Sequence, residues 1–324
     1  MSTPQIILIA LSALVFISII FLLILYWIYA YAFRRSKTDC SPYAELDSKV
    51  MAPYSAANRE RIDRLLSTAC EDVYISSPLD GIRLHARLYR GEAGKPLQIL
   101  CHGYRSTPFR DFSGGALEAM RRGHSVLMID QRAMLESDGK EITFGIRERH
   151  DLLGWTRYAT EEFPGTDIVL IGISMGGATV VAASSLELPE AVRCIISDCP
   201  YAKVKDVLIS TARKMHFPAC VYPLIKLAAK LYGRIDLDEG DLNVHAKGAR
   251  VPILIIHGEA DRLVPCDMSA ELAAANPDMI TRATFEGAHH GISYLTNPER
   301  YVELAYGFIE RHTELGTNNR RTVP

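Results

Sequence analysis

The chain has 324 residues, of which 48% are hydrophobic and 23% charged, and its formal net charge is −2. This length is enough for one large domain or two small ones. The near-neutral balance, without a Lys- and Arg-rich cluster in the body of the chain, gives no electrostatic basis for binding nucleic acid. Seven cysteines, an odd number without Cys-x-x-Cys spacing, favour a reduced compartment over a disulfide framework.

The first notable segment is an apolar run over residues 6–33 that contains no charge. At 1.5 Å per residue, a helix of this length exceeds the roughly 30 Å hydrocarbon core of a bilayer. Aromatic residues gather at its C-terminal end, and Arg34, Arg35 and Lys37 follow at once. By the positive-inside rule, the C-terminal side faces the cytoplasm. We therefore expect residues 1–37 to be an uncleaved, single-pass membrane anchor that places the rest of the chain in the cytoplasm.

The main alternative is a cleaved signal peptide, because Ala30-Tyr31-Ala32 resembles an Ala-x-Ala cleavage site. However, the run is too long for the hydrophobic region of a signal peptide, and no basic residue precedes it. A buried helix of a soluble protein is disfavoured because the run has no polar face.

The polar segment 38–70 follows, and we expect it to be a tether and a leading helix. The folded domain is expected at residues 71–312, and residues 313–324 are expected to form a polar tail. Two strands within 72–89 flank Asp80-Gly81, a dipeptide typical of a hairpin.

Strands and helices then alternate along the chain. Strands are expected at 97–101, 125–130, 167–171, 192–197, 251–257 and 282–285, and helices at 114–122, 147–161, from 178, at 268–276 and at 298–312. This order predicts an α/β fold with a mostly parallel sheet, helices on both faces and an antiparallel start. Residues 202–249 break the alternation, and they predict either a small helical cap over the site or an ordinary connection with one helix.

A strand–turn–helix segment carries the sequence Gly172-Ile173-Ser174-Met175-Gly176-Gly177. Gly-x-Ser-x-Gly in this context is typical of a nucleophile elbow, where the strained turn has no room for a Cβ at the glycines. The motif alone is weak, because a Gly-rich turn that cradles a phosphate would look similar. It is not a Walker loop, since no lysine follows it.

A serine nucleophile needs a base within hydrogen-bond reach and an acid that orients the base. The strand that ends at His257 is followed by Glu259 and Asp261, and the strand after it is followed by His289 and His290. The carboxyl ends of these strands lie at the same sheet edge as the elbow. The order serine, acid, histidine is that of the α/β-hydrolases.

From residue 73 to residue 309, the chain resembles the α/β-hydrolase superfamily, and more narrowly the bacterial membrane-anchored serine hydrolases grouped with esterases and lysophospholipase-like proteins. The resemblance rests on four motifs that occur in the family's order: Leu100-Cys-His-Gly-Tyr104, Gly172-Ile-Ser-Met-Gly-Gly177, His257-Gly-Glu-Ala-Asp-Arg-Leu-Val-Pro265 and Gly287-Ala-His-His-Gly291. It implies an α/β-hydrolase fold, and with the expectations above the predicted architecture is this fold with a small helical cap, preceded by one transmembrane helix.

The resemblance also implies roles for individual residues. It makes Ser174 the nucleophile, Asp261 the acid and His290 the base. Glu259 and His289 stay as alternatives for the acid and the base, but neither stands at the matching family position.

Two backbone N–H groups, those of Tyr104 and Met175, would form the oxyanion hole, whereas His102 and the Tyr104 side chain have no catalytic role in this interpretation. The chain departs from the family after Asp130, where Gln131-Arg-Ala-Met-Leu135 replaces the common Arg-Gly-His-Gly. This departure affects the expected shape of the substrate pocket and leaves the triad unchanged.

The implied activity is that of a serine hydrolase that cleaves small-molecule or lipid-like carboxylic esters through an acyl-enzyme, with no cofactor. We expect no metal at His289 and His290, because neighbours in an extended stretch point to opposite faces. Peptidase, thioesterase or acyltransferase chemistry on the same fold, or an inactive hydrolase fold used for binding, are the alternatives. The sequence leaves the physiological substrate, its acyl-chain length and the oligomeric state open.

Overall fold

The core of the protein is one eight-stranded sheet with the order β1-β2-β4-β3-β5-β6-β7-β8, seen in a computed structural model that describes residues 2–35, 41–44 and 46–313. The strands are β1 (Glu71–Ser76), β2 (Arg83–Tyr89), β3 (Leu97–Cys101), β4 (Ser125–Asp130), β5 (Ile168–Ile173), β6 (Val192–Asp198), β7 (Ile253–Gly258) and β8 (Ile280–Phe285). Strand β2 pairs antiparallel with β1 and β4, and all other neighbours are parallel. The predicted mostly parallel sheet with an antiparallel start is confirmed.

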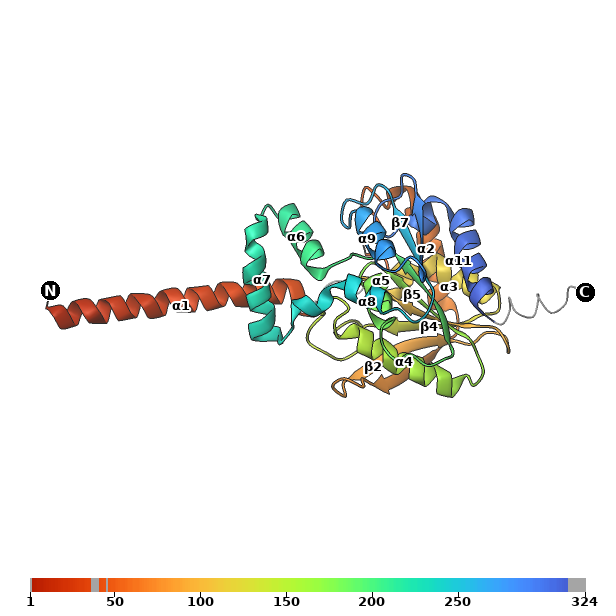
Figure 1. Cartoon of the computed structure of the whole chain (residues 1–324), viewed down its shortest axis with the longest axis horizontal. Coiled ribbons are helices and arrows are strands. Elements are labelled where there is room, and N and C mark those ends of the chain that lie inside the picture. Colours follow the sequence, from red (N-terminus) through yellow and green to blue (C-terminus); the bar gives the residue numbers. More distant parts are fainter. Residues whose placement is uncertain (1, 36–40, 45, 314–324) are drawn as a thin grey trace, which may run out of the picture.

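Helices cover both faces of this sheet (Figure 1). The helices around the sheet are α2 (Ser55–Ser67), α3 (Pro108–Arg121), α4 (Glu148–Glu162), α5 (Met175–Ala183), α9 (Asp267–Ala275), α10 (Ser293–Thr296) and α11 (Pro298–His312). Side chains of α4 and α5 pack with one face of the strands, and those of α2, α3 and α11 pack with the other. Alternate residues of the parallel strands, such as Ile99 and Leu100, join opposite cores, which explains why these strands are apolar throughout.

Helix α3 begins at Pro108, so the expected start at residue 114 is wrong. The side chain of Thr107 accepts a hydrogen bond from the N–H of Arg110 at 3.2 Å, and Pro108 occupies the first helical position. Both are start signals for a helix, because the cap satisfies an orphan N–H and proline has none to satisfy. Thr107-Pro108 signals a helix start in the sequence, but Gly114 and Gly115, which follow it, weaken the helical pattern.

Residues 202–249 contain several short helices, as the cap interpretation expected. They are α6 (Val204–Lys214), η2 (Ala219–Val221), α7 (Tyr222–Ala228), the π-helical η3 (Ala229–Gly233), η4 (Leu237–Gly240) and α8 (Leu242–Lys247). Helices α6 and α7 project from the sheet domain toward the N-terminal helix, and α7 lies across it (Figure 1).

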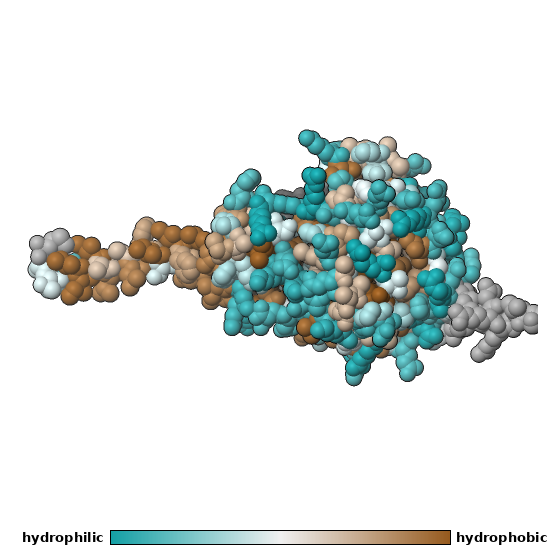
Figure 2. Space-filling model, turned by 45° about the horizontal axis from the view of Figure 1, so that its top comes forward, coloured by the Kyte–Doolittle hydropathy of each residue, from teal (hydrophilic) through white to brown (hydrophobic). Residues whose placement is uncertain are grey.

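The N-terminal apolar run forms one helix, α1 (Thr3–Phe33), which extends far beyond the body of the protein (Figure 1). By length and composition, it is the one helix among the described residues that could cross a membrane. Its apolar surface is exposed along most of its length and runs up to a largely hydrophilic body (Figure 2). Lys37 and nearly all of the predicted C-terminal tail lie outside the described residues.

The last turns of α1 are part of the hydrophobic core of the sheet domain. Leu25, Tyr29 and Phe33 are buried and belong to the same hydrophobic cluster as helices α4, α5 and α7. Phe33 packs edge-on against Phe144 at 5.8 Å between ring centroids. The C-terminal end of α1 is therefore part of the folded domain, whereas the rest of the helix is apolar and exposed.

Candidate active site

Ser174 lies at the turn between β5 and α5, with a φ angle of +56°. A non-glycine residue in this region is strained, and such strain is a property of the nucleophile elbow. A Cβ added to Gly172 would overlap with the backbone of Gly176, and a Cβ added to Gly176 would overlap with the carbonyl of Cys101. The glycines therefore allow the close strand–helix crossing that holds Ser174 at the apex.

Three side chains predicted from the sequence meet at this apex. The Nε2 atom of His290 lies 2.8 Å from the Oγ atom of Ser174. The Nδ1 atom of the same ring lies 2.6 Å from Oδ2 of Asp261. The imidazole thus connects the serine to the carboxylate, although 116 residues separate it from the former and 29 from the latter.

Asp261 is buried, and it accepts hydrogen bonds from the base, from His257 and from its own loop. Its Oδ1 accepts the N–H groups of Leu263 and Val264 at 2.8 and 2.9 Å. Burial acts to raise the pKa of Asp261, but the hydrogen bonds from His257 and His290 outweigh it and hold that pKa well below its usual range. The carboxylate therefore stays ionised and can orient the His290 ring.

His257 is a second histidine on Asp261 that the sequence analysis did not assign. Its Nε2 atom lies 3.3 Å from Oδ2 of Asp261 and 2.9 Å from the carbonyl oxygen of Val264, so this nitrogen donates. The ring is fully buried at the end of β7. The signal in the sequence was its position, four residues before the acid at the end of a strand.

The two alternative residues lie outside this network. The carboxylate of Glu259 accepts a hydrogen bond from the hydroxyl of Thr284 at 2.6 Å and is exposed. His289 lines a neighbouring cavity, and the described structure gives it no hydrogen bond to Ser174 or Asp261.

The predicted oxyanion donors flank the serine. Met175 is the first residue of α5, where N–H groups have no partner within the helix, and Tyr104 follows the end of β3. In the part of the chain that the structure describes, neither N–H donates a hydrogen bond to the protein. Gly103 is fixed beside them because its N–H donates to Oδ2 of Asp111 at 2.7 Å. His102 is buried, and its Nε2 accepts the N–H of Gln131 at 3.1 Å.

The segment after Asp130, where the chain departs from the family pattern, packs behind residues that line the site. Ala133 and Met134 are buried and pack with Met175 and Tyr104. Arg132 is also buried and donates two hydrogen bonds, at 2.6 and 2.8 Å, to Asp151.

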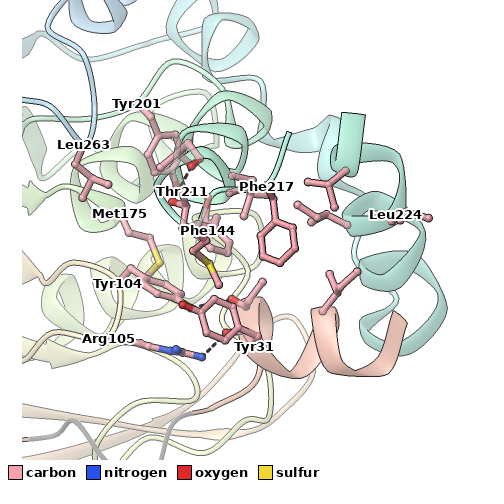
Figure 3. A pocket seen from close by; sticks show the side chains of 18 of the residues that line it. Tyr31, Tyr104, Arg105, Phe144, Met175, Tyr201, Thr211, Phe217, Leu224 and Leu263 are labelled. Atoms are coloured by element: carbon pink, nitrogen blue, oxygen red, sulfur yellow. Dashed lines mark hydrogen bonds between the residues drawn. The ribbon is translucent and has the colours of Figure 1, made fainter. Parts of the chain in front are cut away.

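Ser174 opens onto two cavities. The apolar chamber has a volume of about 540 Å³ and is lined by side chains of α1, the cap and the core (Figure 3). The polar chamber has a volume of about 580 Å³ and lies on the side of His289 and His290. Ser174, Tyr104 and Leu263 line both. Each volume is in the range of a small-molecule site.

The lining of the apolar chamber was not foreseen from the sequence. Besides Ser174, it includes the following side chains: Ile24, Trp27, Ile28, Tyr31 and Ala32 of α1; Val207, Leu208, Thr211, Phe217, Leu224 and Ile225 of the cap; and Tyr104, Phe144, Met175 and Tyr201 of the core. Figure 3 shows Tyr104, Phe144 and Met175 at one end of the cavity and Leu224 at the other, with Tyr31 projecting from α1. The membrane-anchor interpretation accounted for the aromatic residues of α1 without giving them a place in the site.

One group of metal-capable atoms occurs here, formed by Cys199, Asp261 and His290 within 4.8 Å of one another. Two of the three are already bound to each other, and burial raises the pKa of the Cys199 thiol well above its usual value. A protonated thiol is a poor metal ligand, so this group fits an acid–base pair better than a metal centre.

Comparison with known proteins agrees with this geometry. A family model described as the alpha/beta hydrolase fold matches residues 99–238. A thiohydrolase of Aspergillus aculeatus, aneE, is 32% identical over 127 residues, which are 38% of this chain and 39% of that protein. The uncharacterized protein YqkD of Bacillus subtilis is 24% identical over 217 residues, 65% of this chain and 70% of YqkD.

Among solved structures, the esterase Pf2001 of Pyrococcus furiosus superposes with a TM-score of 0.63 at 23% identity, and the match covers 77% of this chain and 93% of the esterase. At this identity the likeness concerns the fold alone. With the family-model match, this superposition and the sheet order described above, the chain is an α/β-hydrolase-fold protein.

Proposed function

We propose that the protein is a serine hydrolase that cleaves carboxylic esters, with Ser174, His290 and Asp261 as its catalytic triad. The observation that carries the proposal is the pair of hydrogen bonds through His290, 2.8 Å to Ser174 and 2.6 Å to Asp261, at a serine open to two cavities.

The geometry supports a two-step reaction. His290 Nε2 takes the proton of the Ser174 hydroxyl as Oγ attacks the ester carbonyl carbon, and Asp261 stabilises the imidazolium. The N–H groups of Tyr104 and Met175 donate to the oxyanion, where each such donor is worth roughly 100- to 1,000-fold in rate. His290 returns the proton to the leaving alcohol. In the second step, His290 takes a proton from water as the water attacks the acyl carbon, and it returns that proton to the Ser174 oxygen as the carboxylic acid leaves.

We assign the two cavities to the two parts of an ester substrate. The apolar chamber fits the acyl part of an ester, and the polar chamber, which Arg262 and Lys214 border, fits the alcohol part. A thioester is the second candidate, because the relative from Aspergillus aculeatus is named a thiohydrolase.

We also propose that α1 is an uncleaved membrane anchor. Cleavage after Ala32 would remove Leu25 and Tyr29 from the core, and it would remove the carbonyl that the Tyr104 hydroxyl binds. The loss of buried side chains and hydrogen bonds is costly to a folded domain, and this disfavours the signal-peptide alternative.

The test of the activity uses the full-length protein in detergent micelles. We expect a fluorophosphonate probe to label wild type at Ser174, as seen by mass spectrometry, and a short-chain p-nitrophenyl ester to be hydrolysed. Ser174→Ala should abolish both, with unchanged thermal unfolding. A folded wild type that neither reacts with the probe nor hydrolyses esters or thioesters would instead support the binding-protein alternative.

A further inference from the structure

The apolar chamber begins at the proposed nucleophile and ends at the helix that could cross a membrane. Ser174 and Met175 lie at its inner end. Of the α1 residues that line the chamber, Ile24 and Trp27 are the two farthest from the C-terminus of that helix. Trp27 is 53% exposed and Ile24 is 47% exposed, so the outer end of this lining is open to the surroundings of α1.

The position of this outer end along α1 coincides with the expected bilayer surface. All side chains from Thr3 to Ile24 are exposed, and Leu25 is the first that is buried by the domain. A helix over Thr3–Ile24 is about 33 Å long at 1.5 Å per residue, close to the roughly 30 Å of a hydrocarbon core. Trp27 and Tyr31 would then lie in the interfacial layer that favours such side chains.

The cap contributes the other side of the opening and reaches the same level. The Tyr232 hydroxyl donates to the carbonyl of Leu22 at 2.9 Å, so η3 touches α1 within its exposed part. Phe217, Leu227 and Leu231 of the cap are large apolar side chains that are 43% to 50% exposed. Exposed apolar side chains next to an apolar helix indicate a surface that contacts lipid.

From these observations we propose that α1 and the cap together form an acyl-chain subsite that opens to the bilayer, and that the substrate is a membrane-resident lipid ester. The acyl chain leaves the hydrocarbon layer between α1 and the cap and lies in the apolar chamber, which places the ester at Ser174. The polar part of the lipid then occupies the polar chamber. This inference rests on the proposed function of Ser174.

Residue 32 offers a direct test, because Ala32 lines the chamber close to Tyr104 while the neighbouring Ala30 does not line it. Ala32→Leu adds three carbons inside the chamber and keeps the carbonyl that Tyr104 binds. Ala30→Leu is the matched control on the same helix. Each full-length variant is reconstituted in phosphatidylcholine vesicles, and kcat/KM is measured for monoacylglycerols from C8 to C18 in the bilayer and for water-soluble p-nitrophenyl acetate.

For wild type, we expect hydrolysis of the long-chain lipids. Ala32→Leu fills part of the chamber and should reduce long-chain hydrolysis roughly tenfold or more, since even one extra methylene in a pocket is worth about tenfold or more. The ratio of long-chain to acetate kcat/KM should therefore fall roughly tenfold or more, and Ala30→Leu should leave both rates unchanged. Trp27→Ala alters the open end of the chamber, so its result does not depend on whether the fold tolerates a larger side chain at position 32. It should raise KM for the long-chain lipids alone.

The two proposals fail differently. If wild type hydrolyses neither substrate and no probe labels Ser174, the proposed function fails. If wild type hydrolyses acetate but no long-chain lipid, or if Ala32→Leu and Trp27→Ala change long-chain and acetate hydrolysis equally or not at all, the esterase remains and the bilayer-facing subsite is overturned.

Discussion

The phenol hydroxyl of Tyr104 donates a hydrogen bond to the backbone carbonyl of Ala32 at 3.0 Å, joining the proposed oxyanion loop to the end of α1. The next residue, Arg105, donates to the carbonyl of Tyr31 at 2.7 Å and to that of Arg34 at 3.3 Å. The last carbonyls of a helix have no partner within it, so outside donors are needed to satisfy them. Here the donors come from the loop that carries the proposed oxyanion N–H.

This connection predicts an effect of a single hydroxyl. Tyr104→Phe should lower kcat about fivefold with little change in KM, because the loss of a hydrogen bond worth about 1 kcal/mol loosens the oxyanion loop. Tyr89→Phe is the matched control, since that hydroxyl also bonds a backbone carbonyl, that of Leu65, and neither residue lines a cavity at Ser174. Steady-state ester hydrolysis measures both. Equal kcat values for the two variants would mean that the Tyr104 hydroxyl does not position the loop.

The neighbouring histidines should differ sharply. His290→Ala should lose activity as fully as Ser174→Ala, about a million-fold in turnover, because a triad acts as a unit. His289→Ala should lose far less, since its ring lines the polar chamber without a bond to the serine. Turnover of a p-nitrophenyl ester gives the ranking. The reverse order would require the triad to be redrawn around His289.

Substitutions of two phenylalanines of α1 should affect the stability of the domain very differently. Phe33 is fully buried, whereas Phe16 is 65% exposed. Phe33→Ala should lower the free energy of unfolding by about 3–5 kcal/mol, as is common for buried aromatic side chains, and Phe16→Ala should leave it unchanged. Emission from Trp155, which is buried in α4, follows domain unfolding in detergent. A Phe33 variant as stable as wild type would show that α1 is not part of the core.

Asp198 should make stability depend on pH. Burial raises the pKa of Asp198 to about 6, against the opposing effects of His257 and the Ser293 hydroxyl. The native state therefore keeps a proton that the unfolded chain has lost, and this contribution to stability disappears as pH rises from about 4 to about 6. Asp198→Asn lacks the titrating carboxyl group, so its free energy of unfolding does not have this dependence on pH. Its stability relative to wild type should increase over that interval by an amount on the order of 3 kcal/mol and stay level above it.

Urea unfolding from pH 4 to pH 8 measures this difference, with Asp278→Asn, at an exposed position, as the control. A difference between Asp198→Asn and wild type that does not vary with pH would contradict the raised pKa.

The orientation in the membrane is predicted by the charges that follow α1. By the positive-inside rule, we expect Arg34 and Arg35 to keep the folded domain in the cytoplasm. Protease added to intact cells should leave the domain uncut, and permeabilised cells should lose it. A secreted chain that begins near Phe33 would instead support the signal-peptide alternative.

The sequence by itself determined the elements whose information is local. The apolar strands were identifiable because both of their sides are buried, and Gly-x-Ser-x-Gly identified the elbow because a tight crossing excludes Cβ atoms. The order of Ser174, Asp261 and His290 pointed to one sheet edge, since parallel strands end on the same side. Only the resemblance to the family selected His290 over His289. Adjacent residues in an extended stretch point to opposite faces, but this does not show which of the two reaches the serine.

Only the tertiary structure decided what α1 does beyond its length. Leu25, Tyr29 and Phe33 recur every four residues and form the buried face, but every other face of α1 is apolar too, so periodicity gives no contrast. The lining of the apolar chamber likewise combines residues of α1 with cap residues about 200 positions later. Such contacts depend on how helices without polar faces pack together, and no local pattern in the chain encodes that packing.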